Sequence, residues 1–143
     1  MKPARFLLAF ILAAVPVFCQ TPKPAEFAGV WNAEFHKKVW LVLTLETSKD
    51  GLTGTLQHSV QISADDEGDL TRVDDEMSTD KIVKTELEGS VLTIRTRDED
   101  GDEDDYRLTL TGPDSAELQS SVGENAMSPK PFKLKRALTP TQK

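Results

Sequence analysis

Seven carboxylates lie within the eight consecutive residues 98–105, and no lysine or arginine interrupts them. Hard cations such as calcium bind clustered carboxylate oxygens. An EF-hand loop that began at Asp98 would need glycine at its sixth position and glutamate at its twelfth, where this sequence has Glu103 and Thr109. The segment is therefore predicted to be a solvated, self-repelling hairpin loop that binds divalent cations only weakly. The weak calcium candidates are Asp98, Asp100, Asp102 and Asp104.

Other chemistry-bearing residues are few. His36 and His58 are the only histidines and Cys19 is the only cysteine, so a zinc site would need both histidines together with carboxylates from distant strands. Both histidines are predicted instead to be exposed loop or strand-end residues. The sequence contains no Gly-x-Ser-x-Gly, His-Glu-x-x-His or phosphate-binding glycine loop. We therefore expect a protein that is not an enzyme and that uses no cofactor or metal.

The first 19 residues have the pattern of an export signal. Lys2 and Arg5 precede an apolar run at 6–15 that is too short to span a bilayer stably. We expect residues 1–19 to be a signal peptide and the protein to be periplasmic or extracellular. Cys19 is either removed with this peptide or lipidated, and an uncleaved membrane anchor is a third alternative. No second hydrophobic stretch follows, so no membrane insertion is expected after removal of the signal.

Composition restricts the class of fold. Of the 143 residues 38% are hydrophobic, and many of these lie in the signal peptide. Apolar residues are then too scarce for a many-helix domain or a doubly wound α/β enzyme, whereas a small antiparallel sheet closed on itself needs them on one face only. The formal net charge of −7 argues against binding to nucleic acid or to anionic membranes.

Alternation of apolar and polar residues predicts strands along most of the remaining chain. Gly29, Trp31, Ala33 and Phe35 share one parity, and the pattern repeats at 39–45. Asp-Gly and Glu-Gly dipeptides mark hairpin turns. We predict an all-β fold, a small antiparallel up-and-down barrel of about eight strands. The expected layout is a linker at 20–26, the barrel at 27–138 and a tail at 139–143.

Two segments leave alternatives open. Residues 70–77 are consistent with one or two helical turns or with an irregular loop. Trp40 and Val42 have the opposite parity to Val39 and Leu41, so this strand is apolar on both faces at one end. Either residues 70–77 cover that outer face, or a Trp40 face is exposed and available to a partner protein.

The last predicted strand ends with an inward-facing arginine. Arg136 has the parity of Phe132 and Leu134, and an arginine can lie across the indole of Trp31 while it donates to backbone carbonyls. Together with Gly29, these two residues resemble the structural signature of lipocalins and related calycins. The chain looks like a small secreted bacterial lipocalin-like module of mostly unassigned function. The wider match consists of segments 27–31, 39–45, 50–56, 87–89 and 131–136.

This resemblance implies a calycin-like barrel, and binding of a small apolar ligand is the preferred hypothesis. The first alternative is a non-catalytic interaction module of the cell envelope that uses the Trp40 face. The second alternative is weak calcium binding through the acidic loops.

Overall fold

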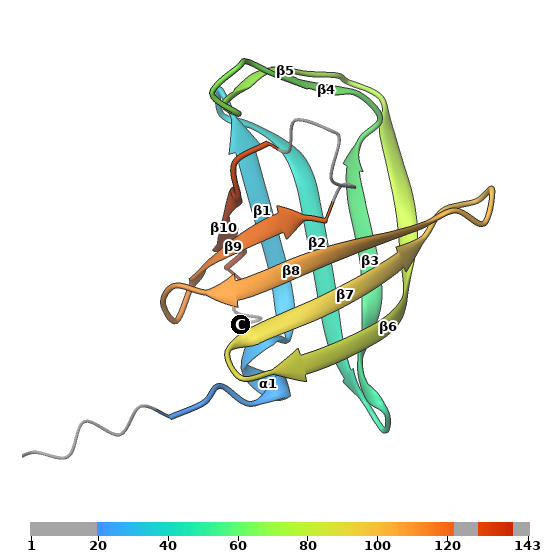
Figure 1. Ribbon diagram of the computed structural model, residues 1–143, viewed down its shortest axis with the longest axis vertical. Helices are drawn as coiled ribbons and strands as arrows, with labels where there is room; N and C mark the ends of the chain where they lie inside the picture. Colours follow the sequence, from blue (N-terminus) through green and yellow to red (C-terminus); the bar gives the residue numbers. More distant parts are fainter. Residues whose placement is uncertain (1–19, 122–128, 139–143) are drawn as a thin grey trace, which may run out of the picture.

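The protein is a closed barrel of eight antiparallel strands, which confirms the predicted fold class (Figure 1). The computed structural model describes residues 20–121 and 129–138. The expected signal peptide at 1–19, with Cys19, and the tail at 139–143 lie outside the described residues. The strand order around the barrel is β1-β10-β9-β8-β7-β6-β3-β2, and β4 pairs with β5 as a separate two-stranded sheet. The elements are α1 Pro24–Phe27, β1 Gly29–Phe35, β2 Lys38–Ser48, β3 Gly51–Ser59, β4 Ile62–Ala64, β5 Leu70–Val73, β6 Met77–Glu88, β7 Val91–Arg97, β8 Glu103–Leu110, β9 Ser115–Ser120 and β10 Phe132–Arg136.

Two local expectations need correction. The expected linker at 20–26 is helical from residue 24, where Pro24 opens α1 in a position that suits its fixed backbone angle. The expectation of helical turns or an irregular loop at 70–77 is wrong. Leu70–Val73 forms the strand β5, which pairs with β4. This β4–β5 hairpin crosses one end of the barrel, and α1 lies at the other end (Figure 1).

Apolar side chains fill the barrel interior. Each strand presents alternate residues inward, so the period-2 pattern of the sequence becomes one shared core. The buried apolar residues are Phe27, Trp31, Ala33, Trp40, Leu41, Leu43, Leu45, Leu52, Leu56, Ile82, Leu92, Ile94, Leu108, Ala116, Leu118, Phe132 and Leu134.

Trp31 and Arg136 close the end of the barrel beside α1. The Arg136 Cζ lies 4.1 Å from the centroid of the Trp31 ring, so the predicted contact is present. The guanidinium donates to the carbonyls of Glu26 (2.8 Å), Ala28 and Pro113 (3.2 Å). The Trp31 indole nitrogen donates to the Phe27 carbonyl at 2.9 Å, which holds α1 against the core.

Gly29 is needed for this arrangement. Its φ of +131° is one that other residues rarely adopt, and a Cβ built there would lie 2.5 Å from Arg136 Nη1. The Gly-x-Trp part of the signature thus has a local physical cause, because the missing side chain makes room for the arginine.

Of the two alternatives for Trp40, the exposed face is not present, because Trp40 is buried. β1 and β2 pair as Ala33 with Leu41 and then Glu34 with Val39, so Trp40 is the extra residue of a β-bulge. The bulge turns both Trp40 and Leu41 toward the core, leaving Trp40 2% exposed and Val39 on the surface. The Trp40 side chain therefore offers no exposed surface to a partner.

Candidate functional site

The two ends of the barrel interior differ in polarity. The end beside α1 is lined by Leu45, Leu52, Leu92 and Trp31, all buried and apolar except for the indole nitrogen. The end beneath the β4–β5 hairpin, here called the rim, combines an apolar arc with a polar arc. In the apolar arc, Trp40 of β2 contacts Phe132 of β10 edge to face, with ring centroids 4.8 Å apart. Leu41 lies next to Trp40 on β2.

The polar arc of the rim consists of inward-facing residues from β3, β6, β7 and β8. His58 Nε2 lies 3.0 Å from Asp80 Oδ2, and His58 Nδ1 lies 2.9 Å from the Ser59 carbonyl oxygen. Asp80 is 4% exposed, and its Oδ1 atom is buried without a hydrogen-bond partner among the described residues. Thr96 of β7 is buried in the same arc. Buried polar groups of this kind cost folding free energy unless they are fully hydrogen-bonded.

Tyr106 lies in the polar arc on β8 and is mostly buried. Burial, with the negative charges of Asp104 and Asp80, raises the pKa of Tyr106 to about 12. No hydrogen bond contributes to this shift. The hydroxyl therefore stays protonated at neutral pH and can donate a hydrogen bond.

Two clefts open at the rim. The first, of about 280 Å³, lies between the barrel and β4 and is lined by Leu41, Ile62, Ala64, Tyr106, Ser120, Pro129 and Phe132. The second, of about 510 Å³, lies beside it between β1 and β10. These two strands pair at Trp31 with Arg136 and at Asn32 with Lys135, and the cleft lies beyond these pairs, toward the rim. Its apolar walls include Phe35, Trp40, Leu70 and Phe132. Phe132 lines both clefts, and the second is also lined by the charged residues Glu34, Asp69, Lys130 and Lys133.

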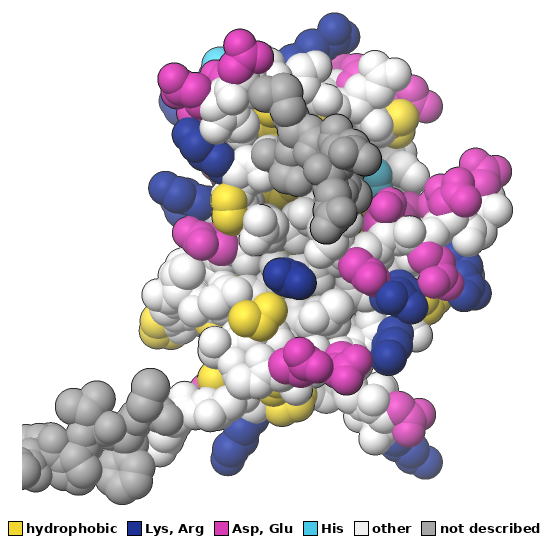
Figure 2. Space-filling view, in the orientation of Figure 1, with side chains coloured by type: hydrophobic (Ala, Val, Ile, Leu, Met, Phe, Trp, Pro, Cys, Tyr) yellow, Lys and Arg dark blue, Asp and Glu magenta, His cyan; other side chains and the backbone are white. Residues whose placement is uncertain are grey.

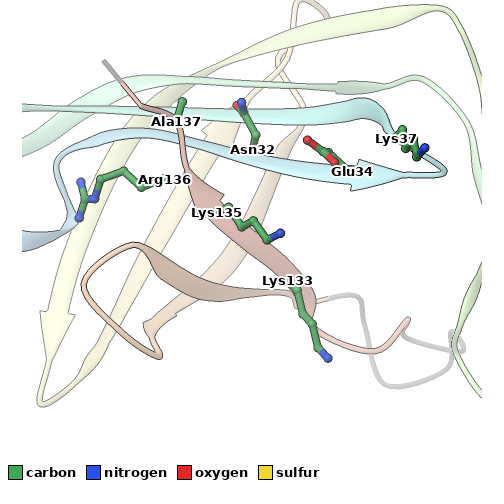
Figure 3. A pocket seen from close by; sticks show the side chains of 7 residues that line it. All are labelled: Asn32, Glu34, Lys37, Lys133, Lys135, Arg136 and Ala137. Carbon is green, nitrogen blue, oxygen red and sulfur yellow. The ribbon is translucent and has the colours of Figure 1, made fainter. Parts of the chain in front are cut away.

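A third hollow, on the outer surface of β1 and β10, is basic rather than apolar. It measures about 490 Å³, and Figure 3 shows Lys133 and Lys135 extending from β10 beside Asn32 and Glu34 of β1. Arg136 points away from these side chains toward the end of its strand (Figure 3), where it contacts Trp31. Exposed lysines in open solvent contribute little binding free energy by themselves, so this hollow is the weaker candidate.

The acidic hairpin is less self-repelling than the sequence suggested. It projects from the barrel between β7 and β8 (Figure 1), and acidic side chains gather on that side of the molecule (Figure 2). Across the two strands Arg95 donates to Asp105 at 2.8 and 3.0 Å, and Arg97 pairs with Glu103. The Arg95 guanidinium holds the pKa of Asp105 below its usual value.

The calcium candidates are not gathered into a site. Asp98 Oδ1 accepts a hydrogen bond from the Asp102 backbone nitrogen at 2.9 Å, which closes the hairpin. In the part of the chain that the structure describes, no three histidine, cysteine, aspartate or glutamate side chains are grouped as a metal site. Weak calcium binding by Asp98, Asp100, Asp102 and Asp104 stays a prediction.

The histidines differ from each other in position. His36 is exposed in the β1–β2 turn, as expected, and stacks on Phe35. His58 lies at the end of β3, as expected, but its side chain is only 25% exposed, because it points inward and is bonded to Asp80. Asp80 and Tyr106 were not expected to be site residues. A signal for Asp80 was present, since it shares the parity of Ile82 and so falls on the inward face of its strand.

No family model, curated protein or solved structure matches this chain. None of the helices in the described residues is long and apolar enough to span a bilayer.

Proposed function

We propose that this protein is an exported, lipocalin-like binding protein that takes a small apolar molecule at the rim of its barrel. The observation that carries the proposal is the pair of apolar clefts that share Phe132 beneath the β4–β5 hairpin. Because the interior below them is filled by core side chains, the ligand lies across the mouth of the barrel and not along its axis.

The closed end supports the same proposal. The contact of Arg136 with Trp31 and the conformation of Gly29 agree with the calycin signature, in which one end of the barrel is closed and the other is open. The opposite end of this barrel is the rim, where side chains from β2, β8 and β10 meet those of β4.

Titration with an uncharged fluorescent probe, N-phenyl-1-naphthylamine, tests this function on the chain without residues 1–19. We expect saturable enhancement of probe fluorescence with one site per molecule. Ala64→Trp, which places an indole in the cleft, is expected to abolish binding. Ile62→Ser is expected to weaken it about three- to tenfold, because it replaces an apolar wall with a hydroxyl.

Val83→Ser is the matched control. Ile62 and Val83 are both exposed apolar strand residues, at 37% and 43%, but Val83 lies on β6 away from the rim clefts. Its substitution should leave binding unchanged. Equal loss of binding in both serine variants, or no saturable binding by the parent protein, contradicts the proposal.

A further inference from the structure

The polar arc gives the rim a chemical preference among apolar molecules. The cleft of about 280 Å³ is apolar on the side of Leu41 and Phe132 and presents Tyr106 and Ser120 on the opposite side. A purely hydrocarbon ligand would leave these hydroxyl groups unpaired once water is displaced, which lowers affinity.

Two carboxylates act on the Tyr106 hydroxyl. Asp104 precedes Tyr106 by two residues and points to the same face of β8, and Asp80 lies on β6, which is separated from β8 by β7. Both carboxylates contribute to the raised pKa of Tyr106. The same fields would repel the anionic group of a ligand bound at that point.

His58 is engaged within the polar arc. Its Nε2 lies 3.0 Å from Asp80 Oδ2, and its Nδ1 lies 2.9 Å from the Ser59 carbonyl oxygen. Lys130, beside the second cleft, is engaged as well, since its Nζ lies 2.7 Å from Asp69 Oδ2. Lys133, on the outer side of that cleft, faces the basic hollow beyond β10.

We infer that the rim selects uncharged apolar alcohols over fatty-acid anions, with the Tyr106 hydroxyl donating a hydrogen bond to the ligand oxygen. This inference rests on the proposed function and specifies the ligand class for the same site. A hydroxyl group suits the position because it accepts from Tyr106 and carries no charge for Asp104 and Asp80 to repel.

Displacement of bound N-phenyl-1-naphthylamine by 1-decanol and by decanoate tests the inference. The two competitors have equal chain lengths and differ in the charge of the head group. We expect decanol to compete at least about tenfold better than decanoate at neutral pH. Tyr106→Phe should weaken decanol about three- to tenfold, because it removes one hydrogen bond and little apolar surface.

Two substitutions each remove one negative charge, one near Tyr106 and one far from it. Comparing them distinguishes the effect of a nearby carboxylate on ligand preference from the effect of the overall net charge. Asp104→Asn removes a carboxylate near Tyr106, and Asp100→Asn removes one at the hairpin tip. Asp104→Asn should reduce the preference for decanol over decanoate, and Asp100→Asn should leave it as in the parent protein. Circular dichroism would confirm that each variant is folded.

The failures of the two proposals are distinguishable. If the probe does not bind, both the proposed function and this inference are overturned. If the probe binds but decanoate competes as well as decanol, or Tyr106→Phe leaves decanol unaffected, the inference alone is overturned.

Discussion

Replacement of Arg136 by methionine tests how the barrel is closed. The methionine keeps an apolar stem over Trp31 but removes the guanidinium. Lost with it are the hydrogen bonds to the carbonyls of Glu26, Ala28 and Pro113 and the stacking at 4.1 Å. Each hydrogen bond contributes about 0.5 to 1.5 kcal/mol net, and the cation–π contact about 0.5 to 2 kcal/mol.

The carbonyls of Glu26 and Pro113 are accessible to water after the substitution, so their bonds count at the low end of that range. We therefore expect Arg136→Met to lower the free energy of unfolding by about 2 to 4 kcal/mol. With a urea m-value of about 2 kcal/mol/M, the midpoint should fall by about 1 to 2 M. Arg107→Met is the control, since Arg107 is exposed on the outer face of β8, and it should change stability by less than about 0.5 kcal/mol.

Gly29→Ala completes a double-mutant cycle with Arg136→Met. In the parent background the alanine has a strained φ and also a Cβ 2.5 Å from Arg136 Nη1. In the Arg136→Met background the strain remains but the clash with the guanidinium is gone. The double variant should thus lose about 1 kcal/mol less than the sum of the single losses. Additive losses, or an Arg136→Met protein as stable as its parent, would refute the reasoning.

Three further predictions concern single residues. Trp31→Ala should cost about 3 to 5 kcal/mol through lost core packing, and an unchanged urea midpoint would contradict this. Lys37→Gly should raise stability by about 0.5 to 1 kcal/mol, because Lys37 has a φ of 67° that glycine adopts without strain; a lower thermal midpoint would argue against it. Tyr106 is the only tyrosine, so the ultraviolet absorbance of phenolate reports its ionisation alone, with an expected midpoint near pH 12 while circular dichroism shows a folded chain. The pKa of Tyr106 in the folded protein lies above the usual value of 10.0, so unfolding releases a proton at any pH between about 10 and 12. The free energy of unfolding should therefore fall as pH rises through this range. Ionisation of Tyr106 in the folded protein near pH 10 would contradict the burial argument.

The barrel was predictable because its strands alternate cleanly and its hairpin turns are short. The same alternation placed Trp31 and Arg136 on inward faces, and their contact followed from the closure of the sheet between the first and last strands. Alternation fails where an extra residue enters a strand. The bulge at Trp40 reverses the parity of β2 at that point, and it is determined by pairing with β1, which the β2 segment alone does not show.

The polar pair at the rim was missed for a different reason. His58 and Asp80 lie on β3 and β6, which are neighbours in the barrel but are separated in the chain by the β4–β5 hairpin. Sequence periodicity indicates which face a residue takes but not which distant strand lies beside it. By contrast, the ion pair of Arg95 with Asp105 joins consecutive strands and could have been deduced from the hairpin register.

The contrast between the two ends of the barrel bears on where binding occurs. At the end beside α1, two polar groups that enter the core are matched: the Trp31 nitrogen bonds to Phe27 and the Arg136 guanidinium bonds to three carbonyls. At the rim, Asp80 is equally buried but one of its oxygens has no partner among the described residues. An apolar residue of similar volume would pack at that position without the cost of a buried carboxylate. Stability alone therefore does not account for Asp80. The proposed discrimination among ligands by charge would account for it, and the competition between decanol and decanoate tests that explanation directly.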